Sequence, residues 1–589
     1  MSLFSKADPA RWPYKSGFNV SFEKDTDIEI GKLNIANAEF ICPGDIVHLS
    51  ENVILRFFAQ QAPFFTPLTA TIRAWFVPLR LIEENTEWII TGSKNGKFMK
   101  EADGSETELP KFDKLFAYDD SSVTGHHTVK IGGIAEQMFG MPTVKGDGVT
   151  TLDYSTIKDC KVIPALYWMK GYFRLWFDYY RDENLFDYED FDDWWDAVLA
   201  EGKIGQQDLL PVNWKKDYLT SMLYSQQKGV APVLNPFINN PQLSIPITKI
   251  AEHSVDSVNN TLHELFPEYV GVSGEYLQRG ANFYSPRVPD IAMINNQYTA
   301  QAVSASANLY QDTPGAGNNT QLLGINTDSL KSIQGGFNAS ELRLLFAQQK
   351  IFERLMRCGS RYVEYLMSNF GIAPADETLQ RVQYLGGFKQ SVVTSEVLQT
   401  SESGTTPLGT QGGHSISAGG NKIGSYTFKE FGLLYVTISV MPKAQYTQGI
   451  NRKFGLCERF DFPNPSFQFL SEDEVLNGEV YVDTDTASDG SLMNDKTMGF
   501  QEMYAWLKSN RDMICGNLRG SEAYWTMPRL FSSRPNLNER FLTSVGDSSN
   551  FTIPFAVTDK PPILMRAGNV VHMWRNFAKY GTPGLLDHY

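Results

Sequence analysis

Short stretches of alternating apolar and polar residues are spread along the chain and predict β-strands. The clearest is Leu433–Val440, where the even-numbered residues would face one side of a sheet and the odd-numbered residues the other. Similar alternation occurs at Val53–Phe58, Thr71–Val77, Phe551–Val557 and Val570–Phe577. These strands do not alternate with helices at short intervals, which disfavours a doubly wound α/β fold. The pattern favours a mainly β protein with helical insertions, arranged as a jelly roll with long loops.

Helical periodicity appears in three stretches between the strands: Gly171–Asn184, Phe191–Glu201 and Asn338–Asn369. The third begins with a capping-box pattern, because Asn338 can cap a helix and Glu341 follows three residues later. Its apolar residues at helical spacing are Leu342, Leu345, Phe346, Phe352 and Met356. This spacing predicts a helix with one buried face.

Three regions lack clear periodicity. Lys94–Asp147 is charged and glycine-rich, and Val270–Gln334 is polar and rich in Asn, Gln, Ser, Gly and Ala. Thr405–Lys422 is a shorter glycine-rich stretch that we expect to be an exposed loop. A long segment without structure of its own inside a compact chain is usually functional or disordered.

Composition and charge narrow the function classes. A length of 589 residues suggests several domains by itself, and 42% hydrophobic residues can build a large core. The net charge of -15 argues against a protein that coats nucleic acid over its whole surface. It still allows a few basic residues to face a nucleic acid.

The cysteines and the first residues of the chain indicate the cellular compartment in which the protein is made. The five cysteines are far apart and include no Cys-x-x-Cys pair, so they indicate neither a disulfide framework nor a zinc site. We expect them to be buried thiols of a protein made in a reducing cytoplasm. The first residues lack the apolar segment of a signal peptide, and no apolar run is long enough to span a membrane.

Candidate chemistry is sparse. The adjacent His126 and His127 would point to opposite faces of a strand and could not share a metal, so we expect two solvated loop histidines. The run of Asp483, Asp485 and Asp489 lacks the spacing of a calcium loop, which favours a solvated acidic turn over a weak ion site. Neither a nucleophile elbow nor a phosphate-binding loop occurs. We therefore predict no enzymatic activity, no cofactor and no metal, and expect function to lie in surfaces.

One basic and aromatic cluster stands out in residues 1–24, which we predict to be an N-terminal arm. Its candidate DNA-facing residues are Lys6, Arg11, Trp12, Tyr14 and Lys15. Alternating cations and aromatic rings suit single-stranded DNA, whose bases stack and whose phosphates pair with cations. The alternative is an arm whose rings are buried against neighbouring protein, and the small local charge of +2 favours it.

Eight segments occur in one order along nearly the whole chain. They are CPGDIVHL (Cys42–Leu49), APFFTPLTATIRAWFVPLRLI (Ala62–Ile82), YFRLWFDYYRDENL (Tyr172–Leu185), DYLTSMLYSQQKG (Asp217–Gly229), the helical stretch within Gly336–Gly387, FGLLYVTISVMPKAQYTQGI (Phe431–Ile450), GFQEMYAWLKSNRDMICGNLR (Gly499–Arg519) and YGTPGLLDHY (Tyr580–Tyr589). Together they resemble the major capsid protein of the Microviridae, small icosahedral bacteriophages with single-stranded DNA, in the gokushovirus branch. Leu223–Ser225 replaces a proline–tryptophan pair usual in that family, and Cys358 replaces a usual glycine. These departures suggest a divergent lineage.

The resemblance implies a single eight-stranded viral jelly-roll β-barrel with long elaborated loops. Residues 1–589 would form one domain, with an internal arm at 1–24, a charged insertion at 94–147 and a variable surface protrusion at 270–334. Pentamers would assemble into a T=1 icosahedral shell around a circular single-stranded DNA genome. Expected partners are other copies of the chain, the packaged DNA, small basic DNA-associated proteins, and pilot or minor virion proteins. Assembly would take place in the cytoplasm of the bacterial host.

The resemblance also places host attachment on the protrusion, whose receptor could be a glycan. The candidate host-contact residues are Thr313, Asn318, Asn319, Gln321 and Asn326. The alternative function is a glycan-binding or cupin-like jelly-roll protein. A cupin enzyme needs clustered histidines around one metal, and the eight histidines here are dispersed. A secreted lectin would need an export signal, and its small oligomers would differ in size from a capsid.

Overall fold

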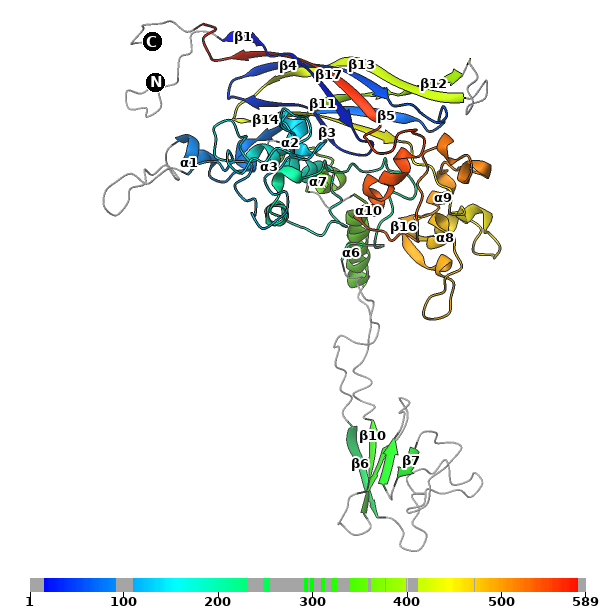
Figure 1. The fold of residues 1–589 in the computed structure, drawn as a ribbon. Coiled ribbons are helices and arrows are strands. Elements are labelled where there is room, and N and C mark those ends of the chain that lie inside the picture. The colour runs from blue at the N-terminus through cyan, green and yellow to red at the C-terminus, as the bar shows by residue number, and fades with distance from the viewer. Residues whose placement is uncertain are drawn as a thin grey trace, which may run out of the picture. The chain divides into compact units, whose positions relative to one another are not determined.

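The structure is a computed structural model and describes most of the chain (Figure 1). The described residues are 15–91, 110–229, 247–254, 291–294, 297–300, 309–312, 319–325, 339–358, 362–376, 378–398, 400, 411–470 and 472–580. The chain divides into two compact units. The larger combines Met1–Lys228 with Glu353–Tyr589, and the smaller is Gly229–Phe352.

The larger unit contains two antiparallel sheets, with helices and short elements to one side of them (Figure 1). The first has the order β1-β17-β4-β13-β12, and β2 pairs with β17 beside β1. Its strands are β1 (Ser16–Asn19), β2 (Phe22–Ile28), β4 (Ile46–Phe57), β12 (Val393–Leu398), β13 (Gln411–Thr427) and β17 (Ile563–Arg575). The second has the order β11-β5-β14-β3. Its strands are β3 (Asn34–Ile41), β5 (Leu68–Pro78), β11 (Gln383–Ser391) and β14 (Gly432–Pro442).

The facing sides of the two sheets share one hydrophobic core. Alternation along β4 buries every second residue, and the inward side chains of β17, β5 and β14 join the same cluster. Representative members are Leu49, Val53, Ile72, Leu434 and Met565. Because neighbouring side chains on a strand point to opposite faces, this period of two decides which residues enter the core.

Helices cover the other side of the four-stranded sheet. The main ones are α3 (Tyr167–Tyr179) and α4 (Phe191–Ala200), whose first turn is capped by Asp190. Their aromatic side chains form a second core with Trp75 of β5 and Tyr435 of β14, and the Tyr435 hydroxyl donates to the backbone oxygen of Trp168 at 2.6 Å. Strand β14 is therefore buried on both faces, and its predicted alternation is confirmed.

Residues 443–555 carry short elements around a third core beside the sheets. These elements are η5 (Arg452–Phe454), η6 (Pro465–Phe467), β15 (Glu472–Leu476), α8 (Asn477–Val480), η7 (Met493–Asp495), β16 (Thr497–Glu502), α9 (Ala505–Lys508), η8 (Gly516–Arg519), η9 (Ala523–Trp525), α10 (Glu539–Leu542) and η10 (Ser544–Thr552). The third core contains Leu219, Met222, Tyr446, Val475, Val480, Phe541 and Leu542.

A long insertion separates β5 from its sheet neighbour β11. Before the small unit it contains η1 (Leu79–Leu81), α1 (Thr86–Thr91), α2 (Ile134–Phe139), α3, α4 and η2 (Ile204–Gln206). The small unit has a sheet of order β6-β10-β9 and a β7-β8 pair. Their bounds are β6 (Ile247–Ser254), β7 (Ile291–Ile294), β8 (Gln297–Ala300), β9 (Leu309–Asp312) and β10 (Asn319–Ile325). Helices α6 (Ala339–Cys358) and α7 (Tyr362–Phe370) lead back to β11.

Two predicted elements are wrong. Phe551–Val557 is not a strand: η10 ends at Thr552, and Phe551 and Phe555 are both buried at a spacing of four rather than two. From residue 411 onward, the predicted glycine-rich loop is strand β13, which pairs with β4 in the sheet. The glycines there fit crowded positions, since a Cβ on Gly420 would lie 1.9 Å from Oδ1 of Asn52.

The long predicted helix is confirmed as α6 and α7, but its buried face is not. Met356 is buried, whereas Phe346 is 65% exposed. Leu342, Leu345 and Phe352 are half-buried. The proposed cap Asn338 lies outside the described residues. A helix with an apolar stripe can leave that stripe uncovered in a single chain when its partner is another molecule.

The cysteines also differ from expectation. Cys160, Cys457 and Cys515 are exposed and Cys42 is half-buried, so these thiols are not core residues. The side chain of Cys358 is not described. None of the helices in the described part of the chain combines the length and apolar composition needed to cross a membrane.

Candidate functional site

The predicted DNA-facing arm lies mostly outside the described residues, which exclude Lys6, Arg11, Trp12 and Tyr14. Lys15 is exposed, and its Nζ donates to the backbone oxygen of Gly44 at 2.6 Å. The arm leads into β1, which pairs with the end of β17. It therefore joins the chain at an edge of the six-stranded sheet, and its DNA contact stays a prediction.

The predicted host-contact residues are divided in the same way. Thr313, Asn318 and Asn326 lie outside the described residues, whereas Asn319 and Gln321 belong to β10. In the backbone register, Gln321 is opposite Glu252 of β6 and Gln311 of β9. The two residues thus lie on the central strand of the small sheet, and their role stays a prediction.

The ionisable residues bear on whether the chain could hold a metal. Within the described part of the chain, no three His, Cys, Asp or Glu side chains are arranged to hold a metal. His126 and His127 lie in a turn with ring centroids 4.2 Å apart. The expectation of two solvated histidines is wrong for His127, which is 5% exposed and packs against Phe116. Burial lowers the pKa of His127, which favours its neutral form.

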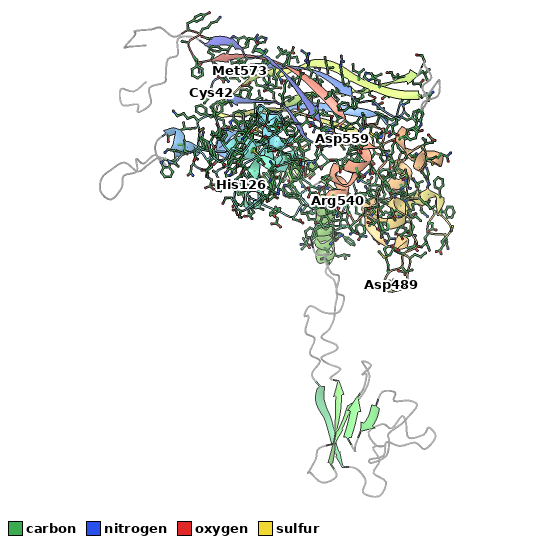
Figure 2. The ribbon with its side chains drawn as sticks, viewed as in Figure 1. Cys42, His126, Asp489, Arg540, Asp559 and Met573 are labelled. Carbon is green, nitrogen blue, oxygen red and sulfur yellow. The ribbon has the colours of Figure 1, made fainter. Side chains whose placement is uncertain are left out.

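Two aspartates of the acidic turn at 483–489 are paired with cations. Asp483 pairs with Arg534, and Oδ2 of Asp489 lies 2.7 Å from Nζ of Lys496. Hydrogen bonds from Lys496 and Ser491 hold the pKa of Asp489 well below its usual range. Asp489 lies in a loop away from the two sheets (Figure 2). These pairings favour the predicted acidic turn over an ion site.

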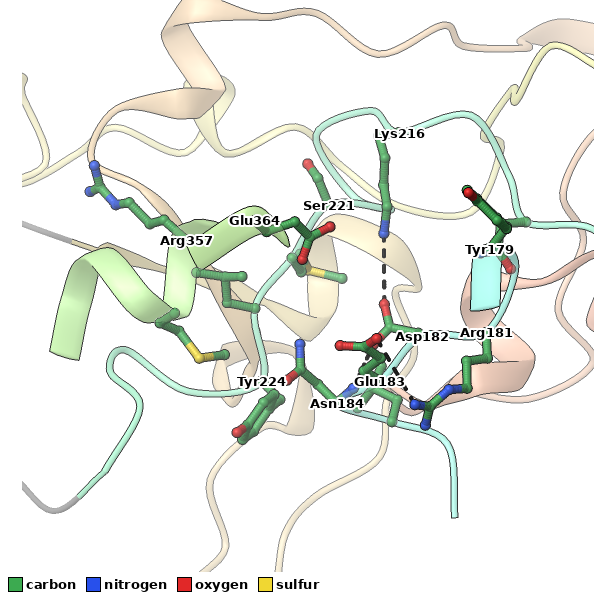
Figure 3. A pocket seen from close by; sticks show the side chains of 15 residues that line it. Tyr179, Arg181, Asp182, Glu183, Asn184, Lys216, Ser221, Tyr224, Arg357 and Glu364 are labelled. Atoms are coloured by element: carbon green, nitrogen blue, oxygen red, sulfur yellow. Dashed lines mark hydrogen bonds and ion pairs between the residues drawn. The ribbon is translucent and has the colours of Figure 1, made fainter. Parts of the chain in front are cut away.

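A polar cleft of about 390 Å³ opens beside the end of α3 (Figure 3). Its acids and bases face one another: Asp182 lies 3.9 Å from Lys216, and Arg181 lies 3.9 Å from Glu183. The Ser221 hydroxyl donates to the backbone oxygen of Asp217 rather than to a base. The cleft thus has paired charges but does not have the hydrogen-bonded nucleophile and base of a hydrolase.

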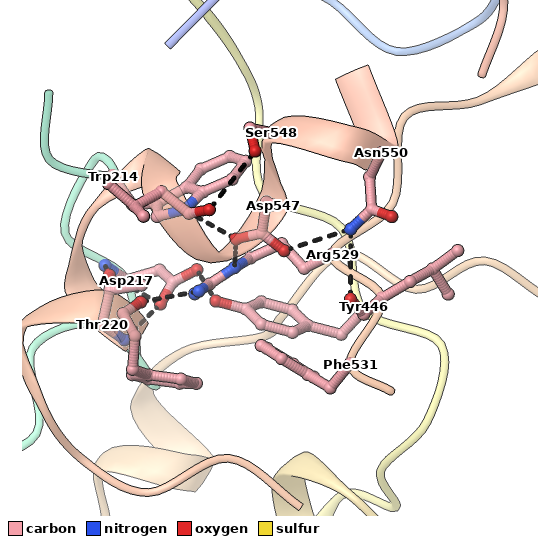
Figure 4. A network of polar contacts seen from close by, with 12 residues as sticks. Trp214, Asp217, Thr220, Tyr446, Arg529, Phe531, Asp547, Ser548 and Asn550 are labelled. Atoms are coloured by element: carbon pink, nitrogen blue, oxygen red, sulfur yellow. Dashed lines mark hydrogen bonds and ion pairs between the residues drawn. The ribbon is translucent and has the colours of Figure 1, made fainter. Parts of the chain in front are cut away.

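A fully buried ion pair organises the third core (Figure 4). Nε of Arg529 lies 3.0 Å from Oδ2 of Asp547, and neither side chain is exposed. Trp214 Nε1 donates to the same carboxylate at 3.1 Å, and Arg529 Nη2 donates to the backbone oxygen of Phe541 at 2.6 Å. The pair therefore joins the insertion to segments more than 300 residues later in the chain.

Aromatic rings surround this pair and limit its access to water. The Arg529 guanidinium lies 4.6 Å from the ring centroid of Phe541 and 4.9 Å from that of Trp214. Burial raises the pKa of Asp547 although the charge and hydrogen bonds of Arg529 act in the opposite direction. Desolvation thus disfavours the ionised carboxylate more than its interactions with Arg529 favour it, as is common for buried ion pairs.

A second buried acid, Glu51, lies on the core-facing side of β4 and is completely buried. It is opposite Asn569 of β17, whose amide fits best with its nitrogen turned to both carboxyl oxygens at 3.0 Å. Burial raises the pKa of Glu51 to about 8. Asn569 is a neutral donor, so it stabilises the ionised carboxylate less than a cation would.

Sequence patterns did not indicate these buried groups. Arg529 and Asp547 lie in segments without periodicity, so nothing in the sequence marks them as partners. The burial of Glu51 could have been predicted from the sequence. If the alternation of Val53–Phe58 is extended by two residues toward the N-terminus, Glu51 lies on the same inward face as Val53.

Exposed apolar side chains are concentrated in residues 450–470, which we call the aromatic loop. It carries six large exposed hydrophobic residues, Ile450, Phe454, Phe460, Phe462, Phe469 and Leu470. Clusters of exposed apolar side chains of this extent mark interaction surfaces more often than single exposed residues do.

The two facing antiparallel sheets define a protein of mainly β architecture. A family described as "Capsid protein (F protein)" matches residues 13–585. The chain therefore belongs to this capsid protein family, and its role is that of a structural protein in a Microviridae-type phage virion.

Three relatives are similar over most of their length, and each is described as capsid protein VP1. The protein of Chlamydia phage 1 is 25% identical, covering 97% of this chain and 96% of the relative. That of Bdellovibrio phage phiMH2K is 27% identical, covering 90% and 88%, and that of Spiroplasma virus 4 is 26% identical, covering 71% and 72%. The resemblance inferred from the sequence segments is confirmed.

Proposed function

We propose that the chain is the shell-forming subunit of its virion and that its two sheets are one eight-stranded jelly roll. The pairing order supports this, with β2-β17-β4-β13 facing β3-β14-β5-β11. Two four-stranded antiparallel sheets packed face to face are the arrangement of viral jelly rolls. In this proposal β1 and β12 extend the first sheet, and residues 94–147 and 270–334 are insertions into a single domain.

The proposed shell is a T=1 icosahedron built from pentamers. The relatives' description as capsid proteins supports shell formation. Contacts that join two different surfaces close into a ring or shell only when the rotation between subunits fits. The exposed apolar side chains of the aromatic loop are consistent with such contacts.

The proposed content of the shell is a circular single-stranded DNA genome, with the arm at 1–24 facing it. Small basic DNA-associated proteins and pilot or minor virion proteins would share the interior. Their basic charge would offset an acidic chain of net charge -15. Assembly would take place in the bacterial cytoplasm.

The proposed host-attachment region is the insertion at 270–334, which falls within the smaller unit. Its polar composition suits an outer surface, and a loop held on a rigid scaffold is a common place for binding residues. The receptor would be a molecule of the host surface, with a glycan as one candidate.

Assembly is tested by the size of the purified protein. We expect uniform spherical particles in electron microscopy and a megadalton mass in light scattering. A monodisperse monomer at high concentration would contradict the proposal. A small stable oligomer that binds glycans would favour the alternative of a lectin-like jelly-roll protein.

The arm is tested by replacing Lys6, Arg11 and Lys15 together with Ala. Empty shells should form as in the parent, while DNA-filled particles should become fewer or release DNA at a lower temperature. Each lost phosphate contact should reduce the salt dependence of DNA retention by roughly one unit of slope. Equal DNA content and equal heat release in variant and parent would show that the arm packs only against protein.

A further inference from the structure

We infer that the aromatic loop, residues 450–470, is a contact surface for a second copy of this chain. The inference rests on the proposed function of shell assembly and names one surface that would carry it. Phe469 is 89% exposed, Phe460 76%, Phe454 68% and Phe462 56%. Side chains of this kind are normally removed from water, so their display in a single chain requires an explanation.

The loop is held in a defined conformation. The backbone nitrogen of Asn464 donates to the Tyr504 hydroxyl at 3.0 Å, and that hydroxyl donates to the backbone oxygen of Asn464 at 3.2 Å. Oδ2 of Asp461 accepts from the backbone nitrogens of Cys457 and Glu458 at 2.9 and 2.7 Å. A loop with its own hydrogen bonds can present side chains to a partner without a large ordering cost.

The base of the loop is anchored as well. Arg452 lies 3.0 Å from Asp473 and donates to the backbone oxygen of Glu474 at 2.7 Å. The backbone nitrogen of Ile450 donates to the oxygen of Gly478 at 3.0 Å. The exposed phenylalanines therefore extend from an anchored segment, whose helix η5 contacts α9.

The exposed area suits a protein partner. With about 200 Å² for each phenylalanine side chain, the four expose roughly 600 Å² of apolar surface. Ile450 and Leu470, 60% and 55% exposed, enlarge the surface further. A standard protein interface removes about 800 Å² from each partner, so this loop could supply most of one side.

The charges of the loop favour protein over nucleic acid. Residues 450–470 contain three basic residues, Arg452, Lys453 and Arg459, and two acids, Glu458 and Asp461. Arg452 is paired with Asp473, and Lys453 donates to Oδ1 of Asn510 at 2.8 Å. Affinity for nucleic acid depends on several cations that meet phosphates. In a shell, another copy of the chain is the protein present at the highest local concentration.

The test replaces Phe460 and Phe469 together with Ser in the full chain. Both side chains are exposed, so the subunit should fold with the parent's circular dichroism and thermal midpoint. We expect roughly a tenfold or greater loss of protein assembled into shells, because exposed aromatic anchors carry much of the energy of an interface. A matched control replaces the exposed Ile131 and Val162 with Ser and should assemble as the parent does.

The outcomes separate this inference from the proposed function. Failure of the parent itself to form shells would contradict shell assembly. Normal shells from the Phe460/Phe469 variant, or equal losses in the control, would overturn the assignment of this loop. Normal shells with less DNA would show that nucleic acid, rather than a second copy, meets the loop, and would also overturn it.

Cys457 gives an independent readout within the native chain. Its exposed thiol lies inside the loop, so a maleimide probe should label it in dissociated subunits and label it several-fold more slowly in shells. Equal labelling rates in subunits and shells would contradict the contact. This measurement needs no substitution and does not depend on the folding of a variant.

Discussion

Replacing Asp547 by Ala is expected to lower the free energy of unfolding by about 3–5 kcal/mol, because it leaves the buried Arg529 without its carboxylate. Both side chains are fully buried. Water cannot readily replace the lost partner, since the rings of Phe541 and Trp214 lie against the guanidinium. Thermal or urea unfolding of dissociated subunits, followed by tryptophan fluorescence, measures the change.

Two further variants test whether the unpaired buried charge of Arg529 causes the destabilisation. Replacing Arg529 by Met and Asp547 by Leu together should recover much of the loss, because two desolvated charges are removed at once. Replacing Arg566 by Met is the surface control, since its pair with Asp25 at 2.6 Å is more than half exposed on both sides. We expect that change to cost far less than Asp547→Ala, because solvent screens an exposed ion pair. A loss for Asp547→Ala as small as the control's would contradict a structural role for the buried pair.

Replacing Glu51 by Gln is expected to stabilise the protein at alkaline pH and to have little effect at pH 5. The pKa of Glu51 is raised from 4.5 to about 8 in the folded chain. Between these values the unfolded chain releases its proton while the folded chain keeps it, so stability falls as pH rises. Gln cannot ionise, so the variant avoids this loss, which reaches up to about 4–5 kcal/mol above pH 8.

The measurement is the unfolding midpoint of parent and variant subunits from pH 5 to pH 9. The midpoints should diverge steadily as pH rises, with the variant the more stable. Replacing the exposed Glu23 of the neighbouring β2 by Gln removes the same formal charge without burial and should follow the parent's pH dependence. Parallel curves for the Glu51 variant and the parent would show that Glu51 ionises in the folded chain as it does in water.

The sequence predicted the elements whose pattern is local. Leu433–Val440 and Thr71–Val77 lie within β14 and β5, and Val570–Phe577 overlaps the end of β17, because one period of two recurs within each. Strand β13 was missed because its glycines resemble a loop. At Gly420 a side chain would collide with Asn52 of β4, and this crowding is visible only once the two strands are paired.

The buried and exposed groups that matter most depend on contacts distant in sequence. Arg529 and Asp547 meet in a core shared with Trp214, and no spacing rule connects these three segments. The phenylalanines of the aromatic loop have the composition of a core segment but are exposed in a segment held by hydrogen bonds between Asn464 and Tyr504. The pattern of apolar residues in the sequence cannot distinguish a residue that faces the core from one that is exposed on the surface of the subunit.

The position of β17 has a consequence for how the chain folds as it is made. Arg566 is opposite Asp25 of β2 on one side and Ile54 of β4 on the other, so β17 lies between two strands from the start of the chain. About 500 residues separate the end of β4 at Phe57 from the start of β17 at Ile563. At roughly 5–20 residues per second, the ribosome needs about 25–100 s to cover that distance. During this time β2 and β4 have open backbone edges in a growing polypeptide, which makes the nascent chain sensitive to chaperone supply and to translation rate.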